Sequence, residues 1–296
     1  MSANSQLHDT QLHDTRPCAL GEGAFWHPTR RQFFWFDIIG QKLLSRDHEG
    51  ERTWRFGEMV SAAGWVSDDV LLIAGERDLF LFDLETEEIE PVVELEANKP
   101  YTRSNDGRAD RQGGFWIGTM GKNPATGQQE GAIYRFYKGE LRLLFPGIAI
   151  PNAICFTPDG SHGYFSDTTQ QIVWQVALDA QGWPQGARRV FLDLRQDGLY
   201  PDGAVTDAEG NFCNAQWGAG RVAVYSPQGA LLREVRFAAP HTSCPAFGGA
   251  DLSTLFCTSA RQGMSPHDIA ANPEAGKTFA APGFGRGLPE PRVLLK

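Results

Sequence analysis

The sequence predicts an all-β protein of the six-bladed propeller class, and two observations lead to this prediction. A turn signal followed by an apolar strand recurs six times along the 296 residues, and internal repeats of this kind are typical of propeller blades. The strands that follow alternate apolar and polar residues with a period of two, as in DLFLFD, GAIYRFY, QIVWQVALD and RVAVYS. Together the two patterns indicate a repeated antiparallel meander.

The six turn-then-strand segments follow one another along the whole chain. They are HPTRRQFFWFD (27–37), VSDDVLLIAG (66–75), DRQGGFWIGTM (110–120), TPDGSHGYFSD (157–167), DAEGNFCNA (207–215) and GGADLSTLFCTSA (248–260). Their strands begin near Phe34, Leu71, Phe115, Tyr164, Phe212 and Leu255, at intervals of roughly 37 to 49 residues. Propeller blades have this length. A two-sheet sandwich is the structural alternative, but it gives no reason for a blade-length period.

A closed ring also agrees with the weakness of helical signals. Helical periodicity is weak except in SPHDIAANP (265–273), so an architecture of alternating strands and helices has little support. Regular meanders with glycine-rich turns close most naturally as a ring that leaves only short edges. The segment CALGEGAFW starts before the first full unit, and we expect it to complete the last blade with a strand from the N-terminal end. We predict a single propeller domain over residues 17–296.

A polar lead segment precedes the predicted domain. It contains QLHDT twice, at residues 6–10 and 11–15, and each copy supplies one histidine. We predict a disordered tail over residues 1–16, because polar chain ends are seldom ordered. Metal binding by these histidines is the weaker alternative.

Composition and charge restrict the classes of partner. The 36 acidic and 27 basic residues give a net charge of −9, which repels phosphate backbones and argues against nucleic-acid binding. A small neutral or cationic partner fits better, and nothing in the pattern specifies an oligomeric state. No apolar window is long enough to span a membrane, and the start lacks the apolar core of a secretion signal, so we expect a cytoplasmic protein. The five cysteines show no zinc-binding spacing and are expected to be reduced core residues.

Polar residues occupy the same position in four of the six units. These residues are Glu22, Asn105, Asn152 and Asp202, and each precedes by eight positions a turn residue, namely Arg30, Gly113, Gly160 and Gly210. The innermost strand of each blade runs along the central channel, so equivalent positions at its entry converge at one depth. We therefore expect the four side chains to meet in the channel.

Two carboxylates and two amides in one channel indicate a site for a single divalent metal. Hard oxygen ligands suit calcium, magnesium or manganese, whereas zinc or ferrous iron would normally recruit histidine. A buried hydrogen-bond network is the alternative, and polar residues at strand entries also form turns. The metal interpretation is stronger for the set, because repulsion between Glu22 and Asp202 in a confined channel requires a cation or a proton to offset it.

Other groups give weaker signals. Arg103 lies two residues before Asn105 on the same strand face, where it could hydrogen-bond a ligand oxygen, although a salt-bridged or surface arginine is the commoner outcome. The tryptophans Trp26, Trp116 and Trp217 could form walls of a pocket, with core packing as the default. Ser243 lacks the context of a nucleophile and is expected to be structural. The histidines His27, His48, His162, His241 and His267 show no ligand spacing and are assigned to turns or the surface.

At several of these positions the sequence resembles the family of the senescence marker protein (regucalcin), gluconolactonase and bacterial sugar lactonases. The resemblance is carried, in order, by LGEGAFWHP, SNDGRADRQGGFWIGTMG, PNAICFTPDGSHGYFSDT, PDGAVTDAEGNFCNAQWGAGRV, FGGADLSTLFCTSAR and GLPEP, and it covers residues 18–292. It implies a six-bladed propeller that holds one divalent metal, with Glu22, Asn152 and Asp202 as metal ligands. Calcium is the expected ion, with zinc, magnesium, manganese and iron as alternatives. Arg103 and Asn105 would fall at substrate-binding positions.

Two departures from the family pattern concern the site. Where the family usually reads PNG, this chain has Ala153, so the turn after Asn152 must avoid or tolerate a positive φ. Where some members carry a substrate-contacting glutamate shortly after GTM, this chain has GKN at residues 121–123. The second departure puts the substrate, more than the reaction, in question.

The leading hypothesis is a metal-dependent carboxylic ester hydrolase that opens the ring of a sugar lactone to the aldonic acid. Asp202 would take a proton from the attacking water while the metal polarises the lactone carbonyl, with Asp106 as the alternative base. Arg103 and Asn105 would orient the hydroxyl and ring oxygens of the substrate. Two alternatives stay open: a non-catalytic propeller that binds calcium or a metabolite, and a phosphotriesterase-like hydrolase.

Overall fold

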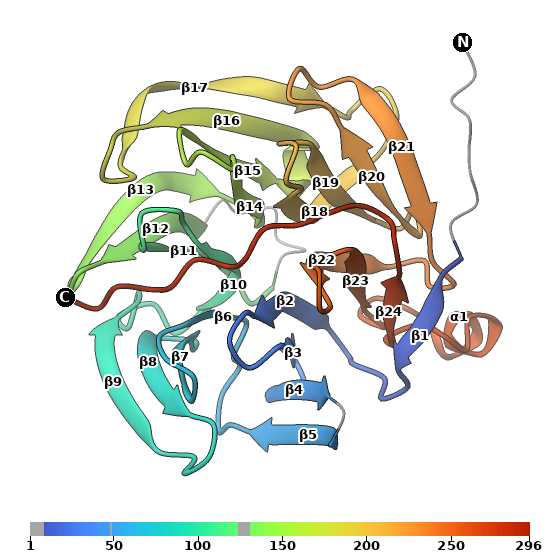
Figure 1. Cartoon of the computed structure of the whole chain (residues 1–296), viewed down its shortest axis with the longest axis horizontal. Coiled ribbons are helices and arrows are strands. Elements are labelled where there is room, and N and C mark those ends of the chain that lie inside the picture. The colour runs from blue at the N-terminus through green and yellow to red at the C-terminus, as the bar shows by residue number, and fades with distance from the viewer. Residues whose placement is uncertain (1–8, 48, 124–130) are drawn as a thin grey trace.

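The computed structural model describes residues 9–47, 49–123 and 131–296, and it confirms the six-bladed β-propeller. Six antiparallel sheets of four strands each stand in a ring (Figure 1). The inner strands of neighbouring sheets contact one another around the ring. Each blade is therefore covered on both faces by its neighbours.

In each blade the four strands lie side by side, in the following spatial order from the axis of the ring outward. Blade 1 holds β2 (Gly21–His27), β3 (Gln32–Asp37), β4 (Lys42–Asp47) and β5 (Gly50–Arg55). Blade 2 holds β6 (Ala62–Trp65), β7 (Val70–Ala74), β8 (Asp78–Asp83) and β9 (Ile89–Glu94), and blade 3 holds β10 (Thr102–Ala109), β11 (Phe115–Gly121), β12 (Gly131–Tyr137) and β13 (Glu140–Ile148). Blade 4 holds β14 (Pro151–Phe156), β15 (His162–Asp167), β16 (Ile172–Leu178) and β17 (Pro184–Asp193), and blade 5 holds β18 (Tyr200–Thr206), β19 (Phe212–Trp217), β20 (Arg221–Tyr225) and β21 (Leu231–Arg236). Blade 6 holds β22 (Thr242–Gly248), β23 (Thr254–Ser259), β24 (Thr278–Ala281) and β1 (Gln11–Asp14).

Every strand predicted from a turn signal is the second strand of a blade. These are β3, β7, β11, β15, β19 and β23. Side chains on both of their faces pack between blades; for example, Trp116 of blade 3 meets Phe156 of blade 4 with ring centroids 5.3 Å apart. Burial on both faces explains why these segments read as nearly continuous apolar runs instead of alternating ones.

The ring is closed by an N-terminal strand, but not by the expected segment. The outermost strand of blade 6 is β1, which pairs antiparallel with β24 and places Gln11 opposite Ala280. CALGEGAFW instead leads into β2, and Leu20 makes only an isolated bridge to Ala260. Closure by the N-terminal end is thus confirmed, by a strand that begins at Gln11, seven residues before the predicted segment begins at Cys18.

The order of β1 corrects the prediction of a disordered tail for residues 11–14. The ring of His13 packs against Phe33 and Phe256, with centroids 5.4 and 4.8 Å away. Arg16 Nη2 donates a hydrogen bond to Asp14 Oδ2 over 2.8 Å. The aromatic partners lie far away in sequence, so a short polar strand can be ordered without a pattern of its own. The first QLHDT copy lies largely outside the described residues.

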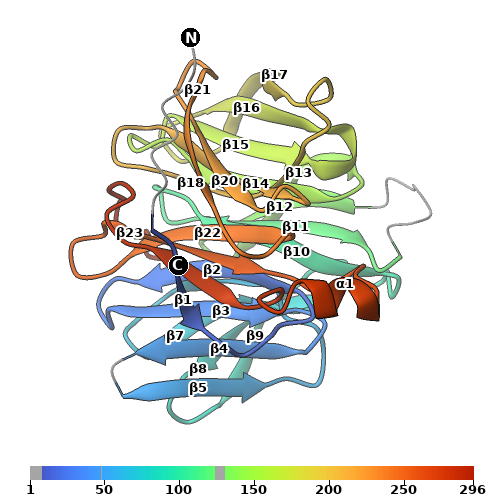
Figure 2. The ribbon, with the colours of Figure 1, turned by 90° about the vertical axis from the view of Figure 1, so that its right-hand side faces the viewer.

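A C-terminal tail follows β24 and crosses one end of the ring (Figure 1). Its backbone bonds to turns of several blades, including Val293 N to Trp65 O over 2.9 Å and Leu294 N to Gly113 O over 2.8 Å. The segment SPHDIAANP, the exception to the weak helical periodicity, contains the helix α1 (Pro266–Ala271), and Figure 2 shows it toward the opposite end of the ring. Within the described parts of the chain, no helix is long and apolar enough to cross a membrane.

Candidate functional site

The inner strands carry β-bulges where the predicted site residues lie. The pairing of β2, β10, β14, β18 and β22 with the next strand shifts register at Glu22/Phe25, Ser104/Gly107, Asn152/Cys155, Pro201/Ala204 and Thr242/Pro245. Strand β6 pairs without such a shift. A bulge leaves residues unpaired and redirects their side chains. Glu22, Asn105, Asn152 and Asp202 therefore lie at or within bulges of four different blades.

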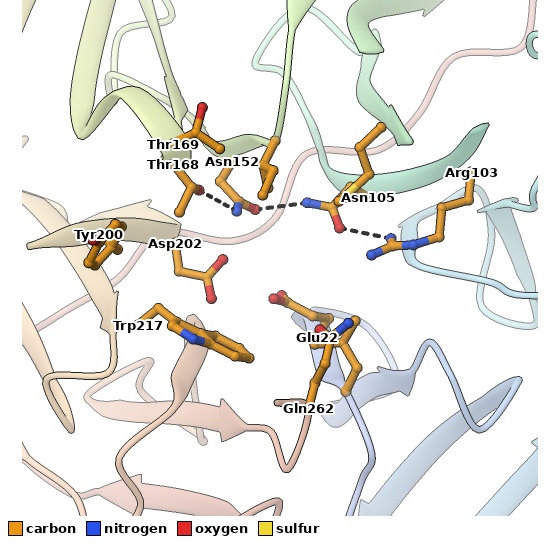
Figure 3. A pocket seen from close by; sticks show the side chains of 13 residues that line it. Glu22, Arg103, Asn105, Asn152, Thr168, Thr169, Tyr200, Asp202, Trp217 and Gln262 are labelled. Carbon is orange, nitrogen blue, oxygen red and sulfur yellow. Dashed lines mark hydrogen bonds between the residues drawn. The ribbon is translucent and has the colours of Figure 1, made fainter. Parts of the chain in front are cut away.

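The structure brings all of the predicted site residues to one cavity. The cavity measures about 310 Å³, and Glu22, Arg103, Asn105, Asn152 and Asp202 all line it. Each of the five side chains belongs to a buried residue. Figure 3 shows the carboxylates of Glu22 and Asp202 directed toward the same space, with the Asn152 amide beside it. The convergence expected from the repeat phase is thus present, whereas the roles assigned to these residues stay predictions.

Electrostatics make the two carboxylates unfavourable neighbours in the absence of a counter-charge. Burial raises the pKa of Asp202 well above its ordinary value, and the charges of Glu22 and Asp106 raise it further. Burial also raises the pKa of Glu22, reinforced by Asp106 and opposed by Arg103. The buried Oε2 atom of Glu22 has no hydrogen-bond partner among the described residues. A buried carboxylate oxygen without a partner is costly unless a cation or a proton satisfies it.

A chain of hydrogen bonds lies beside the carboxylates (Figure 3). Arg103 Nη1 donates to Asn105 Oδ1 over 2.9 Å, and Asn105 Nδ2 donates to Asn152 Oδ1 over 3.1 Å. Asn152 Nδ2 donates to Thr168 Oγ1 over 2.8 Å, and Thr168 Oγ1 donates to Pro201 O over 2.7 Å. The chain joins blades 3, 4 and 5 and fixes the position of each amide.

The donor set fits a divalent cation of the hard type. Two carboxylates and one amide oxygen are ligands that calcium and magnesium accept, and the unpartnered oxygen of Glu22 is available to one. Among the residues that the structure describes, no group of three or more His, Cys, Asp or Glu side chains is placed to hold a metal. A metal centre here would therefore depend on the amide oxygen of Asn152 as well as on Glu22 and Asp202.

Arg103 and Asp106 complete the charges around the cavity. Burial lowers the pKa of Arg103 to about 10, an effect that Glu22 and Glu76 oppose. Asp106 is buried, and its Oδ2 accepts a hydrogen bond from Ile154 N over 2.7 Å. Burial raises the pKa of Asp106 to about 6. Asp106 does not line the cavity, so it is less suited than Asp202 to contact a bound molecule.

The remaining aromatic and hydroxyl predictions have mixed outcomes. Of the three tryptophans, only Trp217 lines the cavity, while Trp116 lies in the core and Trp26 stacks on Phe256. Ser243 is buried and hydrogen-bonded to Gly21 O and Thr258 Oγ1, in agreement with a structural role.

One histidine differs clearly from its assignment to turns or the surface. His27 is fully buried in β2, where its Nε2 pairs with Ser67 O. His241 lies in the connection before β22, as assigned, and its half-buried ring stacks on Trp217 with ring centroids 4.3 Å apart. His48 lies outside the described residues.

The structure also locates the two departures from the family pattern. Ala153 has φ of 57°, so the turn after Asn152 does take the left-handed conformation that glycine favours. In the GKN segment, Lys122 Nζ pairs with Glu76 Oε2 over 2.5 Å. This pair neutralises the lysine charge near the edge of the blade.

Several residues that line the cavity were not singled out in the sequence. They are Leu20, Met120, Ile150, Thr168, Thr169, Tyr200 and Gln262. The pairing of β14 with β15 brings Thr168 close to Asn152, because Thr168 follows Asp167, which lies opposite Pro151, and neither segment shows this pairing by itself. The apolar members give no such signal, because apolar residues near strand ends are common whether they are buried, as Leu20 is, or exposed, as Tyr200 is.

Comparisons with known proteins agree with the propeller fold. The family model for the SMP-30/gluconolactonase/LRE-like region matches residues 20–261. The chain is 36% identical to an L-arabinolactonase of Azospirillum brasilense over 92% of this chain and 91% of that protein, and 30% identical to a 6-deoxy-6-sulfogluconolactonase of Pseudomonas putida over 93% and 95%. The crystal structure of a calcium-binding protein, regucalcin, from Agrobacterium tumefaciens superposes with a TM-score of 0.96 at 38% identity, covering 99% of this chain and 100% of that one.

Proposed function

This chain belongs to the SMP-30/gluconolactonase/LRE-like family, and we propose that it hydrolyses a sugar lactone to the corresponding aldonic acid. The observation that best supports this proposal is the convergence of Glu22, Asn152 and Asp202 on one cavity beside Arg103. Relatives that match nearly the whole chain are named lactonases. The reaction adds water to the carbonyl carbon of the lactone and breaks its bond to the ring oxygen.

The proposal includes one divalent cation, with calcium as the first candidate. Glu22, Asn152 and Asp202 would hold it, and their carboxylate and amide oxygens are the ligands such an ion prefers. When bound, the cation would supply Lewis-acid polarisation of the lactone carbonyl and offset the repulsion between the two carboxylates. The relative from A. tumefaciens, described as calcium-binding, supports this choice of ion.

Asp202 is the proposed general base. Its carboxylate faces the cavity, where it would take a proton from the attacking water as the oxygen of that water bonds to the carbonyl carbon. The proton would then pass to the ring oxygen as the carbon–oxygen bond breaks, which leaves a hydroxyl and a carboxylic acid on the product. Asp106 is less suited, because its Oδ2 is held by Ile154 N and it does not line the cavity.

Arg103 and Asn105 would contact the substrate in different ways. The guanidinium of Arg103 has donors beyond the Nη1 atom that bonds to Ser104 O and Asn105 Oδ1, and these could bind a lactone oxygen. Both Nδ2 hydrogens of Asn105 are engaged, by Pro151 O and Asn152 Oδ1. Asn105 would therefore meet a substrate hydroxyl only as an acceptor, through the second lone pair of its Oδ1.

Proton release from five- and six-membered aldonolactones tests the proposal, with the metal stripped by a chelator and then restored with Ca²⁺. We expect turnover that is lost on stripping and regained on restoring, and an Asp202→Ala variant with neither turnover nor cation affinity. Asp193→Ala is the matched control, because Asp193 is exposed and pairs with the exposed Arg195. Full hydrolysis by Asp202→Ala would defeat the assignment of the base.

The same assay separates the alternatives. A non-catalytic binding propeller predicts no turnover of any lactone in either metal state. A phosphotriesterase-like enzyme predicts faster turnover of aryl phosphotriesters than of aldonolactones. The Arg103 and Asn105 side chains favour the lactone, because they offer several hydrogen-bonding positions to a polyhydroxylated ring.

A further inference from the structure

We infer that Thr168 is a positioning residue that sets the orientation of the Asn152 amide and thereby presents an oxygen, and not an NH2 group, to the divalent cation. This inference rests on the proposed metal centre and assigns a role to a residue that does not itself bind the ion. It follows from the direction of the hydrogen bonds around Asn152.

The hydroxyl of Thr168 can meet Asn152 only as an acceptor. Its single hydrogen is directed to Pro201 O, at an oxygen–oxygen distance of 2.7 Å. Toward Asn152 the hydroxyl therefore offers a lone pair, which accepts from Nδ2 over 2.8 Å. One side of the amide is thus fixed as the nitrogen side.

The other side of the amide is fixed by Asn105. Asn105 Nδ2 donates to Asn152 Oδ1 over 3.1 Å and to Pro151 O over 3.0 Å. The orientation of Asn105 is itself set by Arg103, whose Nη1 donates to Asn105 Oδ1. All donors in this chain point the same way, from Arg103 to Pro201 O.

Reversal of the Asn152 amide would break both of its hydrogen bonds. It would place one NH2 group against the NH2 of Asn105 and an oxygen lone pair against the lone pair of Thr168. Low exposure, 7% for Asn105 and 3% for Asn152, limits the replacement of these lost partners by water. The observed orientation leaves Oδ1 with a second lone pair for a cation, whereas the reversed one would turn a donor toward it.

The position of Thr168 links two of the proposed ligands. The backbone N–H of Thr168 donates a hydrogen bond to Ile150 O over 3.0 Å, which fixes the position of the residue that carries the hydroxyl. Its acceptor, Pro201 O, belongs to the residue directly before Asp202. One hydroxyl therefore connects the amide of Asn152 in blade 4 to the backbone next to Asp202 in blade 5.

Calorimetric titration of the metal-stripped full chain with Ca²⁺ tests the inference without any need for turnover. Thr168→Val keeps the shape of the side chain and removes the acceptor, and we expect it to weaken Ca²⁺ binding by about 10- to 100-fold. Thr168→Ser keeps the hydroxyl and should bind within about threefold of the natural chain. Thr206→Val is the matched control for Ca²⁺ affinity, because Thr206 is a buried threonine whose hydroxyl donates to Phe156 O and which does not line the cavity.

A double-mutant cycle distinguishes orientation from a general structural role. In an Asn152→Asp background the third ligand is a carboxylate with two equivalent oxygens, so no amide orientation remains to be set. Thr168→Val should then change Ca²⁺ affinity by less than about threefold. An equally large loss in both backgrounds would overturn the role in orientation. Thr168→Ala takes the place of the valine variant if the latter fails to fold by circular dichroism.

The two proposals fail in different ways. If the natural chain binds neither Ca²⁺ nor Mn²⁺, the metal centre is wrong and the role of Thr168 falls with it. If the natural chain binds Ca²⁺ and a folded Thr168→Val binds it equally well, only the positioning role is wrong. Lactone hydrolysis enters neither result.

Discussion

The guanidinium of Arg108 is paired with the carboxylate of Glu290, which joins the inner strand of blade 3 to the C-terminal tail. Both side chains are largely buried, at 8% and 13% exposure. Arg108 Nη2 also donates weakly to Ala24 O and Pro245 O, in blades 1 and 6. Arg108 follows Asn105 by three residues along β10, about 10 Å. The tail thus closes the end of the ring that lies away from the cavity.

Removal of the Glu290 charge should destabilise the fold. We expect Glu290→Gln to lower the free energy of unfolding by about 3 kcal/mol, because it leaves a buried guanidinium without its counter-charge. Urea denaturation followed by tryptophan fluorescence measures the change. Glu274→Gln, which breaks the more exposed pair with Lys277, should cost less than about 1 kcal/mol. Combining Glu290→Gln with Arg108→Met should recover part of the loss, and equal midpoints for Glu290→Gln and the natural chain would contradict the closure role.

Because the carboxylates of Glu22 and Asp202 repel each other, we expect Asp202→Asn to have opposite effects on the free energy of unfolding in the absence and in the presence of metal. Burial and the charge of Glu22 raise the pKa of Asp202, so the ionised form is unfavourable in the metal-free fold. We expect Asp202→Asn to stabilise the chelator-treated chain by about 1 to 2 kcal/mol, while it removes the stabilisation by Ca²⁺, about 2.7 kcal/mol at a hundredfold excess over the dissociation constant.

Urea denaturation in chelator and in Ca²⁺ measures both effects. Asp193→Asn, at an exposed position, should change neither. A variant Asp202→Asn that is less stable than the natural chain in chelator would show that repulsion between the carboxylates is not a strain on the metal-free fold.

Closure of the ring by β1 predicts a loss of stability in mild acid. Burial lowers the pKa of His13 to about 4, and the charges of Arg46 and Arg16 act in the same direction while Asp14 opposes them. The unfolded chain takes up a proton at this residue near pH 6.5, but the folded chain takes it up only near pH 4. The free energy of unfolding therefore falls as pH decreases from about 6.5 toward 4, by about 2 kcal/mol between pH 7.5 and pH 5 from this group.

Replacement of the histidine isolates this contribution. His13→Phe can keep the aromatic contacts to Phe33 and Phe256 but cannot titrate, so its stability should differ between the two pH values by about 2 kcal/mol less than that of the natural chain. His267→Ala is the control, because that side chain is 92% exposed. An unchanged pH dependence in His13→Phe would mean that the closing strand does not respond to pH.

The fold and the convergence of the site could be predicted because both follow from local signals. Turn residues and strand alternation are visible within short segments, and the blade-length period fixes their arrangement. Once the phase of the repeat is known, Glu22, Asn152 and Asp202 must occupy equivalent positions. The bulges that redirect these side chains were not predictable, because a register shift is a property of two paired strands and not of one segment.

The parts that escaped prediction depend on partners that are distant in sequence. Strand β1 has only four residues, and its order comes from β24 and from His13 packing among aromatic residues of blades 1 and 6. Thr168 acts between Asn152 and Pro201, which lie 16 and 33 residues away. Neither contact produces a periodic pattern in the sequence, so the order of β1 and the contacts of Thr168 are visible only in the folded chain.

Trp217 forms one wall of the cavity, and we expect its removal to raise KM for the lactone with little change in kcat. The indole lines the cavity and lies nearly parallel to the ring of His241, with an interplanar angle of 16°. An aromatic face of this kind would pack against the apolar face of a sugar ring in the ground state and the transition state alike, so its removal should affect binding more than chemistry. We expect Trp217→Ala to raise KM for the best aldonolactone by about tenfold, with kcat changed by less than about threefold.

The ring of His241 stacks on the indole of Trp217 and does not itself line the cavity, so variants of His241 serve as controls. His241→Phe retains a ring that can stack on Trp217 and should leave KM within about threefold, whereas His241→Ala removes the support and should raise KM partway toward the value of Trp217→Ala. Steady-state kinetics with saturating Ca²⁺ measure all three variants. A fall in kcat with unchanged KM in Trp217→Ala would place the indole in the chemical step and contradict its role as a binding wall.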